Sequence, residues 1–226
     1  MDGETSPAGV RIAYEIAGGS DAPAMVLLHA LGQRRSTWAP VTARFAERFR
    51  VYALDLRGHG DSDWPGEYSL QLMCDDVLGV LDELGLDTAT LVGHSMGGAV
   101  AYLLAIQHPE RVQRLIIEDA APPLPRNGTL PMRPRAALNF DWAVVASIVE
   151  QRNAGDPAAW NGLGKISAPT LLIGGGLQSH IPQDKLEEVA ERIPHSQLVT
   201  LPAGHYVHTS CPSRFADVVL DWLADE

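Results

Sequence analysis

The chain has 226 residues, of which 46% are hydrophobic, and it carries a formal net charge of -11 at pH 7. This length and composition suffice to bury one large core, and they predict a single domain over residues 1–226. The acidic excess argues against partners that carry phosphate charge, so we expect binding to neither nucleic acid nor a membrane surface.

The cysteine content and the first residues bear on location and cofactors. The two cysteines, Cys74 and Cys211, give neither a disulfide framework nor the ligand spacing of a metal site. The N-terminal segment has no basic stretch leading into an apolar core, and no apolar run reaches the length of a membrane span. We therefore expect a cytoplasmic protein with free thiols and with no metal or other cofactor.

Short apolar runs alternate with helical patterns along the chain. Strands are expected at residues 10–16, 25–28, 51–54, 89–92, 114–119, 170–173 and 197–201. Helical periodicity is expected at residues 38–45, 69–84, 97–105, 183–193 and 213–223. Because helices join successive buried strands, this order predicts an α/β fold with a mostly parallel central sheet flanked by helices.

The sequence Gly93-His94-Ser95-Met96-Gly97 follows the strand-like run 89–92 and precedes an apolar helix. The glycines leave room for a sharp strand-to-helix turn, on which the Ser95 hydroxyl projects from the edge of the sheet. The amide of Met96 would then lie at a helix N-terminus, where it can stabilise a developing oxyanion. The pattern therefore predicts Ser95 as a nucleophile.

From this motif outward, the chain resembles the α/β-hydrolase family over nearly its whole length. The matching segments are residues 25–32 (MVLLHALG), residues 51–62 (VYALDLRGHGDS), the serine motif and residues 202–205 (PAGH). The resemblance implies the α/β-hydrolase fold and an oxyanion hole made by the backbone amides of Leu31 and Met96. Ala30 stands where the family more often has glycine.

A serine hydroxyl needs a base to become a good nucleophile at neutral pH. His205 follows the last predicted strand, so it reaches the same edge of the sheet as Ser95, and we expect it to be the base. Four other histidines are expected to be structural or to support the site: His29, His59, His94 and His208.

The acid of the triad is not at the family's usual place. Most relatives carry an aspartate after the seventh strand, where this chain has Gln178 or Ser179. Some relatives instead carry it after the sixth strand, where this chain has Asp119, and we choose that residue. The alternatives are Glu118, Asp184, or a partial replacement of the acid by His180 or a water.

The α/β pattern is interrupted at about residues 120–168, where members of the family carry a helical cap over the active site. The insert is short, so we expect an open pocket. Its apolar side chains either line that pocket or pack the cap onto the core. The candidates for the pocket wall are Phe140, Trp142 and Trp160, together with His29 and His180.

The arginines do not cluster in the sequence. Arg34, Arg35 and the arginines between residues 126 and 135 are expected to be solvated loop charges, with an anion site as the alternative.

Taken with the resemblance, these residues predict a serine hydrolase that cleaves a small ester, lactone or thioester through an acyl-enzyme intermediate. Relatives that hydrolyse epoxides or haloalkanes carry aspartate at the position of Ser95, which argues against both reactions. The alternatives are carbon–carbon bond hydrolysis, acyl transfer, and a hydrolase-like ligand receptor with weak catalysis. The expected partner is a small ester-like molecule, and the sequence leaves the oligomeric state open.

Overall fold

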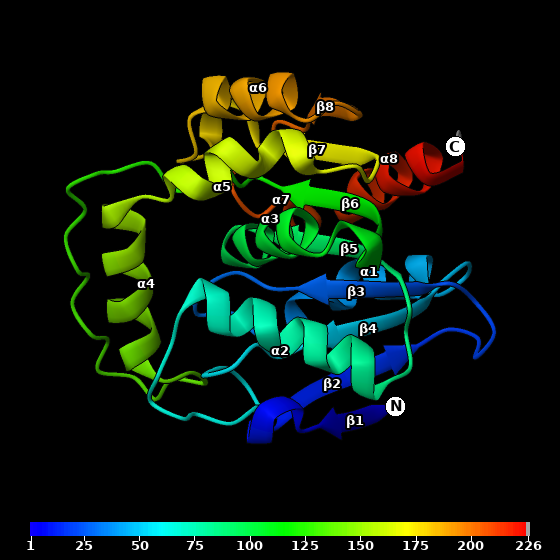
Figure 1. Cartoon of the computed structure of the whole chain (residues 1–226), viewed down its shortest axis with the longest axis horizontal. Coiled ribbons are helices and arrows are strands. Elements are labelled where there is room, and N and C mark those ends of the chain that lie inside the picture. Colours follow the sequence, from blue (N-terminus) through cyan, green and yellow to red (C-terminus); the bar gives the residue numbers. More distant parts are fainter. Residues whose placement is uncertain (225–226) are drawn as a thin grey trace.

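A twisted sheet with helices on both faces forms the centre of the computed structural model, which describes residues 1–224 (Figure 1). Over these residues the sheet has eight strands in the order β1-β2-β4-β3-β5-β6-β7-β8. The strands are β1 (Asp2–Thr5), β2 (Ile12–Ala17), β3 (Ala24–Leu28), β4 (Arg50–Leu54), β5 (Ala89–His94), β6 (Val112–Glu118), β7 (Thr170–Gly174) and β8 (Ser196–Thr200). The β1–β2 and β2–β4 pairs are antiparallel and the other pairs are parallel, so the predicted mostly parallel α/β sheet is confirmed.

The helices are α1 (Ala39–Phe45), α2 (Leu70–Glu83), α3 (Met96–Gln107), α4 (Trp142–Ala154), α5 (Pro157–Gly162), α6 (Gln183–Arg192), α7 (Val207–Ser210) and α8 (Pro212–Ala224). Short 3-10 helices lie at Pro7–Gly9, Arg35–Trp38, Pro109–Arg111, Leu163–Lys165 and Gly176–Gln178. None of the helices within residues 1–224 is both long enough and apolar enough to cross a bilayer.

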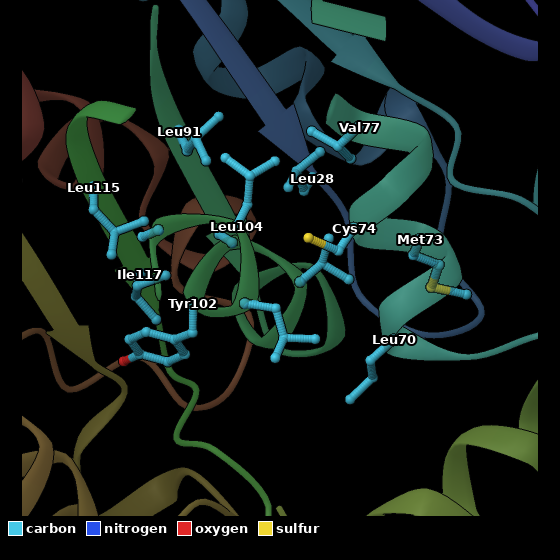
Figure 2. Packing of buried hydrophobic residues seen from close by; sticks show 14 of the residues in the cluster. Leu28, Leu70, Met73, Cys74, Val77, Leu91, Tyr102, Leu104, Leu115 and Ile117 are labelled. Carbon is cyan, nitrogen blue, oxygen red and sulfur yellow. The ribbon is translucent and has the colours of Figure 1, made fainter. Parts of the chain in front are cut away.

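Two apolar clusters hold the helices onto opposite faces of the sheet. On one face, Met73 and Val77 of α2 pack beside Leu104 of α3 and against the strands (Figure 2). On the other face, α1 and α8 pack around Phe45 and Phe215, which are fully buried. Each such buried side chain contributes about 1.5–3 kcal/mol relative to an exposed one, so both helical layers are firmly attached to the sheet.

The register of the central strands brings the residues that follow β3, β5, β6 and β7 to one edge of the sheet. Leu28 at the end of β3 lies beside Gly93 of β5, and His94 lies beside Glu118 of β6. The backbone amide of Asp119 donates to the carbonyl of Ile173 in β7. The segments that follow β3, β5, β6 and β7 therefore all begin at the same carboxyl-end edge.

Two features were not expected from the sequence. Strand β1 pairs with β2, but its residues Asp2–Thr5 are polar and half exposed, so they lack the apolar alternation that predicts a strand. In the insert between β6 and β7, residues 121–140 run without a regular helix or strand before α4 begins at Trp142. Figure 1 shows α4 standing at the carboxyl-end edge of the sheet, away from the two helical layers.

The turn at Ser95 depends on close backbone packing. A Cβ atom at Gly97 would lie 2.2 Å from the carbonyl oxygen of Leu28, and one at Gly93 would lie 2.5 Å from the carbonyl oxygen of Gly97. Real side chains do not approach backbone oxygens so closely. Glycine at both positions lets α3 begin directly against the end of β3.

We predict that Gly97→Ala lowers the free energy of unfolding by about 1–3 kcal/mol, because the added methyl group displaces rigid backbone. Chemical denaturation with a two-state fit measures the change. Gly19→Ala is the matched control, because no atom lies within 4 Å of a Cβ at Gly19. Equal stability of the two variants would contradict the packing argument.

Candidate active site

Ser95 occupies the sharp turn between β5 and α3. Its backbone has φ 52° and ψ -110°, a strained conformation for a residue with a side chain. The turn is held by hydrogen bonds from the Ser95 amide to the carbonyl of Glu118 (3.1 Å) and from the Ala99 amide to the carbonyl of Ser95 (3.0 Å). Such a turn exposes the serine hydroxyl, and Ser95 lines a pocket.

Asp119 and His205 form a hydrogen-bonded pair at the same edge of the sheet. Nδ1 of His205 lies 2.6 Å from Oδ2 of Asp119, whose side chain is fully buried. Asp119 also has a positive φ of 47°, so two of the strained residues of the chain lie at the ends of neighbouring strands. A proton on Nδ1 serves this contact and leaves Nε2 free to accept another proton.

Asp119 receives two further hydrogen bonds. The Gly175 amide donates to Oδ1 at 2.8 Å, and the Ser179 hydroxyl donates to Oδ2. Burial by itself would raise the pKa of Asp119, but the bonds from His205, Ser179 and Gly175 together lower it below its ordinary value. Asp119 is therefore held as a carboxylate.

The role of Ser179 was missed in the sequence. Ser179 is one of the two residues at the family's usual acid position, and there its hydroxyl donates to the carboxylate of Asp119, which follows β6. The sequence feature that could have predicted this role is a hydroxyl residue at the position where most relatives carry the aspartate.

A contact between His94 and His205 holds the histidine segment against the serine turn. Nε2 of His94 donates to the carbonyl oxygen of His205 at 2.8 Å, and the two ring centres are 4.7 Å apart. Because His94 directly precedes Ser95 in the chain, this bond ties the segment of His205 to the strand that leads into the serine turn.

Glu118, an alternative for the acid, is bound to a different histidine. Its carboxylate lies 2.7 Å and 2.9 Å from Nδ1 of His208 and accepts the His208 amide at 3.0 Å. Nε2 of His208 contacts the Thr37 hydroxyl at 3.0 Å, and its ring stacks on Trp38. Asp184, the other carboxylate considered, lies in the first turn of α6.

Adjacent residues of one strand thus bind two histidines that lie three residues apart. Glu118 binds the fully buried His208, and Asp119 binds His205 near the pocket. The buried pair of Glu118 and His208 fixes the histidine segment to β6, so it supports the pairing of Asp119 with His205.

His94, Glu118 and His208 are also the one group in residues 1–224 whose ligand atoms, within 4.8 Å of one another, could hold a metal ion. The hydrogen bonds just described already engage the carboxylate oxygens, both ring nitrogens of His208 and Nε2 of His94. Among the ligand atoms of this group, only Nδ1 of His94 is buried without a partner in residues 1–224. The geometry of the group is explained by these bonds.

Two buried histidines support the loop that follows β3. Nδ1 of His29 donates to the Ala30 carbonyl (2.8 Å), and its Nε2 accepts the Leu56 amide (3.0 Å). His59 is bound in the same way, since its Nε2 accepts the Gly32 amide at 3.1 Å. An amide can only donate, so each Nε2 is unprotonated, and burial lowers the pKa of His29 to about 4 and that of His59 to about 3.

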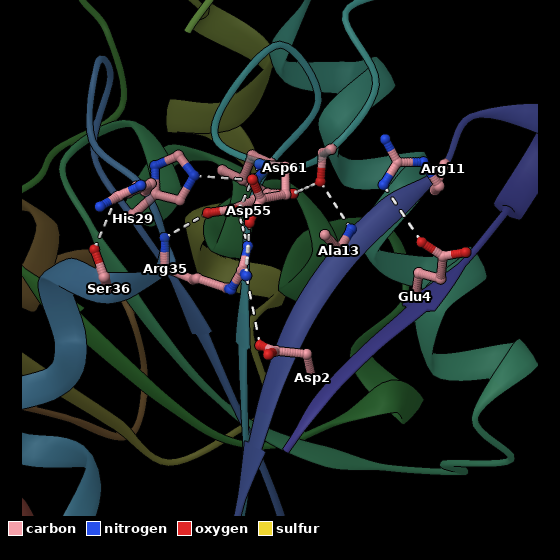
Figure 3. Close-up of polar contacts among 12 residues, drawn as sticks. Asp2, Glu4, Arg11, Ala13, His29, Arg35, Ser36, Asp55 and Asp61 are labelled. Carbon is pink, nitrogen blue, oxygen red and sulfur yellow. Dashed lines mark hydrogen bonds and ion pairs between the residues drawn. The ribbon is translucent and has the colours of Figure 1, made fainter. Parts of the chain in front are cut away.

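Asp55 holds the same loop from the end of β4 (Figure 3). Its carboxylate accepts the amides of Arg35 (2.6 Å) and Asp61 (3.0 Å), and it forms an ion pair with the Arg35 guanidinium. The Arg35 side chain is only 15% exposed. The expectation that Arg35 is a solvated loop charge was therefore wrong, because its partners come from a distant part of the chain.

The loop after β3 positions the amide of Leu31, and the turn at Ser95 positions the amide of Met96. Within residues 1–224, neither amide donates a hydrogen bond to another residue. Both are therefore available as donors to a ligand.

A pocket with an empty volume of about 930 Å³, part of it open to solvent, lies above Ser95 and Met96. Most of its wall comes from the insert, including Ile148 and Trp160, and the rest comes from α2, α3 and the segment around the start of α6. Of the predicted wall residues, Trp160 lies in this wall.

The other four predicted wall residues lie elsewhere. His29 is fully buried under the loop after β3, where both of its ring nitrogens are bound to backbone. Phe140 stacks on His59, and Trp142 packs beside Phe140. The ring of His180 lies against that of His205, with centres 4.1 Å apart.

Comparisons with known proteins agree on one family. A model described as the alpha/beta hydrolase fold matches residues 23–145. A mouse (Mus musculus) protein named sn-1-specific diacylglycerol lipase is 30% identical, over 92% of this chain and 83% of that protein.

Solved structures give the same result over nearly the whole chain. An enol-lactonase from Burkholderia xenovorans LB400 has a TM-score of 0.87 and 27% identity, covering 98% of this chain and 100% of that one. A hydrolase from Pseudomonas aeruginosa PA01 has a TM-score of 0.86 and 26% identity, covering 98% of both chains.

We predict that stability falls as the pH is lowered from about 6.5 toward 4. Burial lowers the pKa of His29 and His94 to about 4 and that of His59 to about 3, so the unfolded chain binds protons that the folded chain excludes. Each histidine then costs about 1.4 kcal/mol per pH unit in this range.

Denaturant unfolding at several pH values measures this slope. His59→Gln should reduce it, whereas His195→Gln, at an exposed position, should not. A stability that stays constant down to pH 4.5 would contradict the prediction.

Proposed function

The chain belongs to the α/β-hydrolase family, and from this premise we propose that it is a serine hydrolase that cleaves a small ester, lactone or thioester through an acyl-enzyme intermediate. The observation that carries the proposal is the 2.6 Å bond between His205 and the buried carboxylate of Asp119, next to the strained turn at Ser95. A nucleophile, a base and a group that orients the base are thus at hand.

In the first half of the reaction, the Ser95 hydroxyl attacks the carbonyl carbon while Nε2 of His205 takes its proton. The carbonyl π electrons move to oxygen, and a tetrahedral intermediate forms. When this intermediate collapses, the bond to the leaving oxygen or sulfur breaks, and His205 returns the proton to that atom. The acyl group is then esterified to Ser95.

In the second half, a water takes the place of the leaving group. His205 removes one proton from it as the oxygen attacks the acyl carbon, and the new tetrahedral intermediate expels Ser95 with the returned proton. Asp119 keeps Nδ1 protonated throughout and stabilises the positively charged imidazole. Its lowered pKa supports this role, because the carboxylate stays ionised near neutral pH.

The amides of Leu31 and Met96 are proposed to bind the oxyanion in both steps. Neither amide has a partner within residues 1–224, and both lie in rigid turns, so no reorganisation is needed as charge develops. A single donor of this kind stabilises a transition state by about 3 kcal/mol. Ala30 does not prevent this, because the donor at the next residue is a backbone amide.

The relatives support carboxylic ester chemistry without selecting one substrate. One is named an enol-lactonase and another a diacylglycerol lipase. The partly open, largely apolar pocket above Ser95 is consistent with a compact acyl group or ring. Carbon–carbon hydrolysis and acyl transfer would use the same residues, and product analysis separates them from ester hydrolysis.

We predict that Ser95→Ala abolishes both covalent labelling by a fluorophosphonate and essentially all ester hydrolysis. The change removes one hydroxyl at the edge of the pocket, so the thermal midpoint should stay close to that of the wild type. Mass spectrometry of the labelled protein and turnover of nitrophenyl esters measure the two effects.

Ser210→Ala, at an exposed position at the end of α7, is the matched control and should be labelled normally. Undiminished turnover by Ser95→Ala would overturn the proposal. A wild-type protein that is inert to the probe but stabilised by a small ligand would instead favour the receptor alternative.

A further inference from the structure

Three cationic side chains line the pocket that contains Ser95. They are Arg126, Arg152 and Lys185, and within residues 1–224 no aspartate or glutamate lines the pocket. This is unexpected in a chain whose formal net charge is -11. The remainder of the wall is mostly proline, alanine and larger apolar side chains.

Backbone contacts hold Arg126 beside Arg152. The Arg126 amide donates to the carbonyl of Asn153 at 3.0 Å, and Asn153 sits in α4 directly after Arg152. The Asn153 side chain exchanges two hydrogen bonds with the backbone of Gly128, at 2.9 Å and 2.7 Å. The loop is also tied to α5, because Nε1 of Trp160 donates to the carbonyl of Pro122 at 3.0 Å.

The part of the chain that the structure describes does not neutralise the two guanidinium groups. Within residues 1–224, neither the Arg126 nor the Arg152 side chain forms an ion pair or a hydrogen bond. Burial and then the charge of Arg126 lower the pKa of Arg152, so its guanidinium is partly desolvated and repelled by its neighbour. Lys185 differs, because it pairs with Glu188.

The charges of Arg126 and Arg152 also affect the pKa of a histidine near the site. Burial, His205, Arg152 and Arg126 all contribute to lowering the pKa of His180, whose ring contacts that of His205. The positive charges of the two arginines therefore contribute to the electrostatic potential of the pocket. The apolar side chains of Ile148 and Trp160 line the same pocket.

Resting on the function proposed above, we infer that Arg126 and Arg152 form a binding site for an anionic group, a carboxylate or a phosphate, carried by the substrate beyond an apolar segment next to the scissile bond. Arginine suits such groups because its planar fork of N–H donors matches two anionic oxygens. The substrate class is then an anionic ester or thioester.

Matched substrates test the inference. For a charge in the acyl group, the pair is 4-nitrophenyl valerate and the mono-4-nitrophenyl ester of glutaric acid. For a charge in the leaving group, the pair is S-acetylpantetheine and its 4′-phosphate. We expect kcat/KM to favour the anionic member of at least one pair by about 10- to 100-fold, as for hydrogen bonds to charged groups.

The arginine variants should remove that preference. In R126Q/R152Q the ratio of kcat/KM for the anionic over the neutral substrate should fall to near 1, and Arg152→Lys should retain part of it. Arg135→Gln is the matched control, an exposed arginine of the same insert outside the pocket wall, and it should keep the wild-type ratio. Thermal midpoints show whether each variant is folded.

A response of the glutarate pair assigns the anion to the acyl group, and a response of the phosphate pair assigns it to the leaving group. Cleavage of neutral esters with no preference in either pair would overturn the inference and leave the proposed function intact. If the wild type cleaves none of these esters, the proposed function fails instead. Binding is then measured as thermal stabilisation of Ser95→Ala by the glutarate ester, and equal stabilisation in R126Q/R152Q would overturn the inference.

Discussion

The site depends on the register between β5 and β6. His94 pairs with Glu118, so the next residues of the two strands, Ser95 and Asp119, leave the sheet side by side. Both adopt positive φ angles, which turn the chain sharply at the edge. A shift of one residue in either strand would reverse which side chains face the pocket. The long helices and the apolar core serve to hold this alignment.

Buried polar groups at the strand ends fix the loops that follow the strands. Glu118 holds His208, and Asp55 holds Arg35, each at or next to the end of a strand. His29 and His59 stay neutral and bind backbone amides under the loop after β3. Leaving any of these groups unpaired in the interior would cost about 1–3 kcal/mol or more. The polar interior therefore fixes two turns whose amides are free to bind a ligand.

The sequence predicted strands β2 to β8, helices α1, α2, α3, α6 and α8, and the pairing of Asp119 with His205, because those features follow from local patterns and from strand order. Strand β1 was missed because its stability comes from pairing with β2 and not from apolar alternation. The setting of Arg35 was also missed, since its partner Asp55 is 20 residues away. Arg152 lies near Arg126 because an irregular loop packs on α4. The hydrophobic periodicity of the sequence does not predict such packing. Most of the pocket wall was unpredictable for the same reason.

The central claim is that the carboxylate at the end of β6 orients the base. In Asp119→Asn, the amide would donate to Nδ1 of His205 and leave the proton on Nε2, where it cannot accept from Ser95. Steady-state hydrolysis of a nitrophenyl ester should then show kcat lowered by up to ~10⁴-fold, with the thermal midpoint confirming a folded protein. Asp184→Asn, in the first turn of α6, should retain kcat within about twofold of the wild type, as surface changes away from a site generally do. An Asp119→Asn enzyme that keeps most of its kcat would contradict the account.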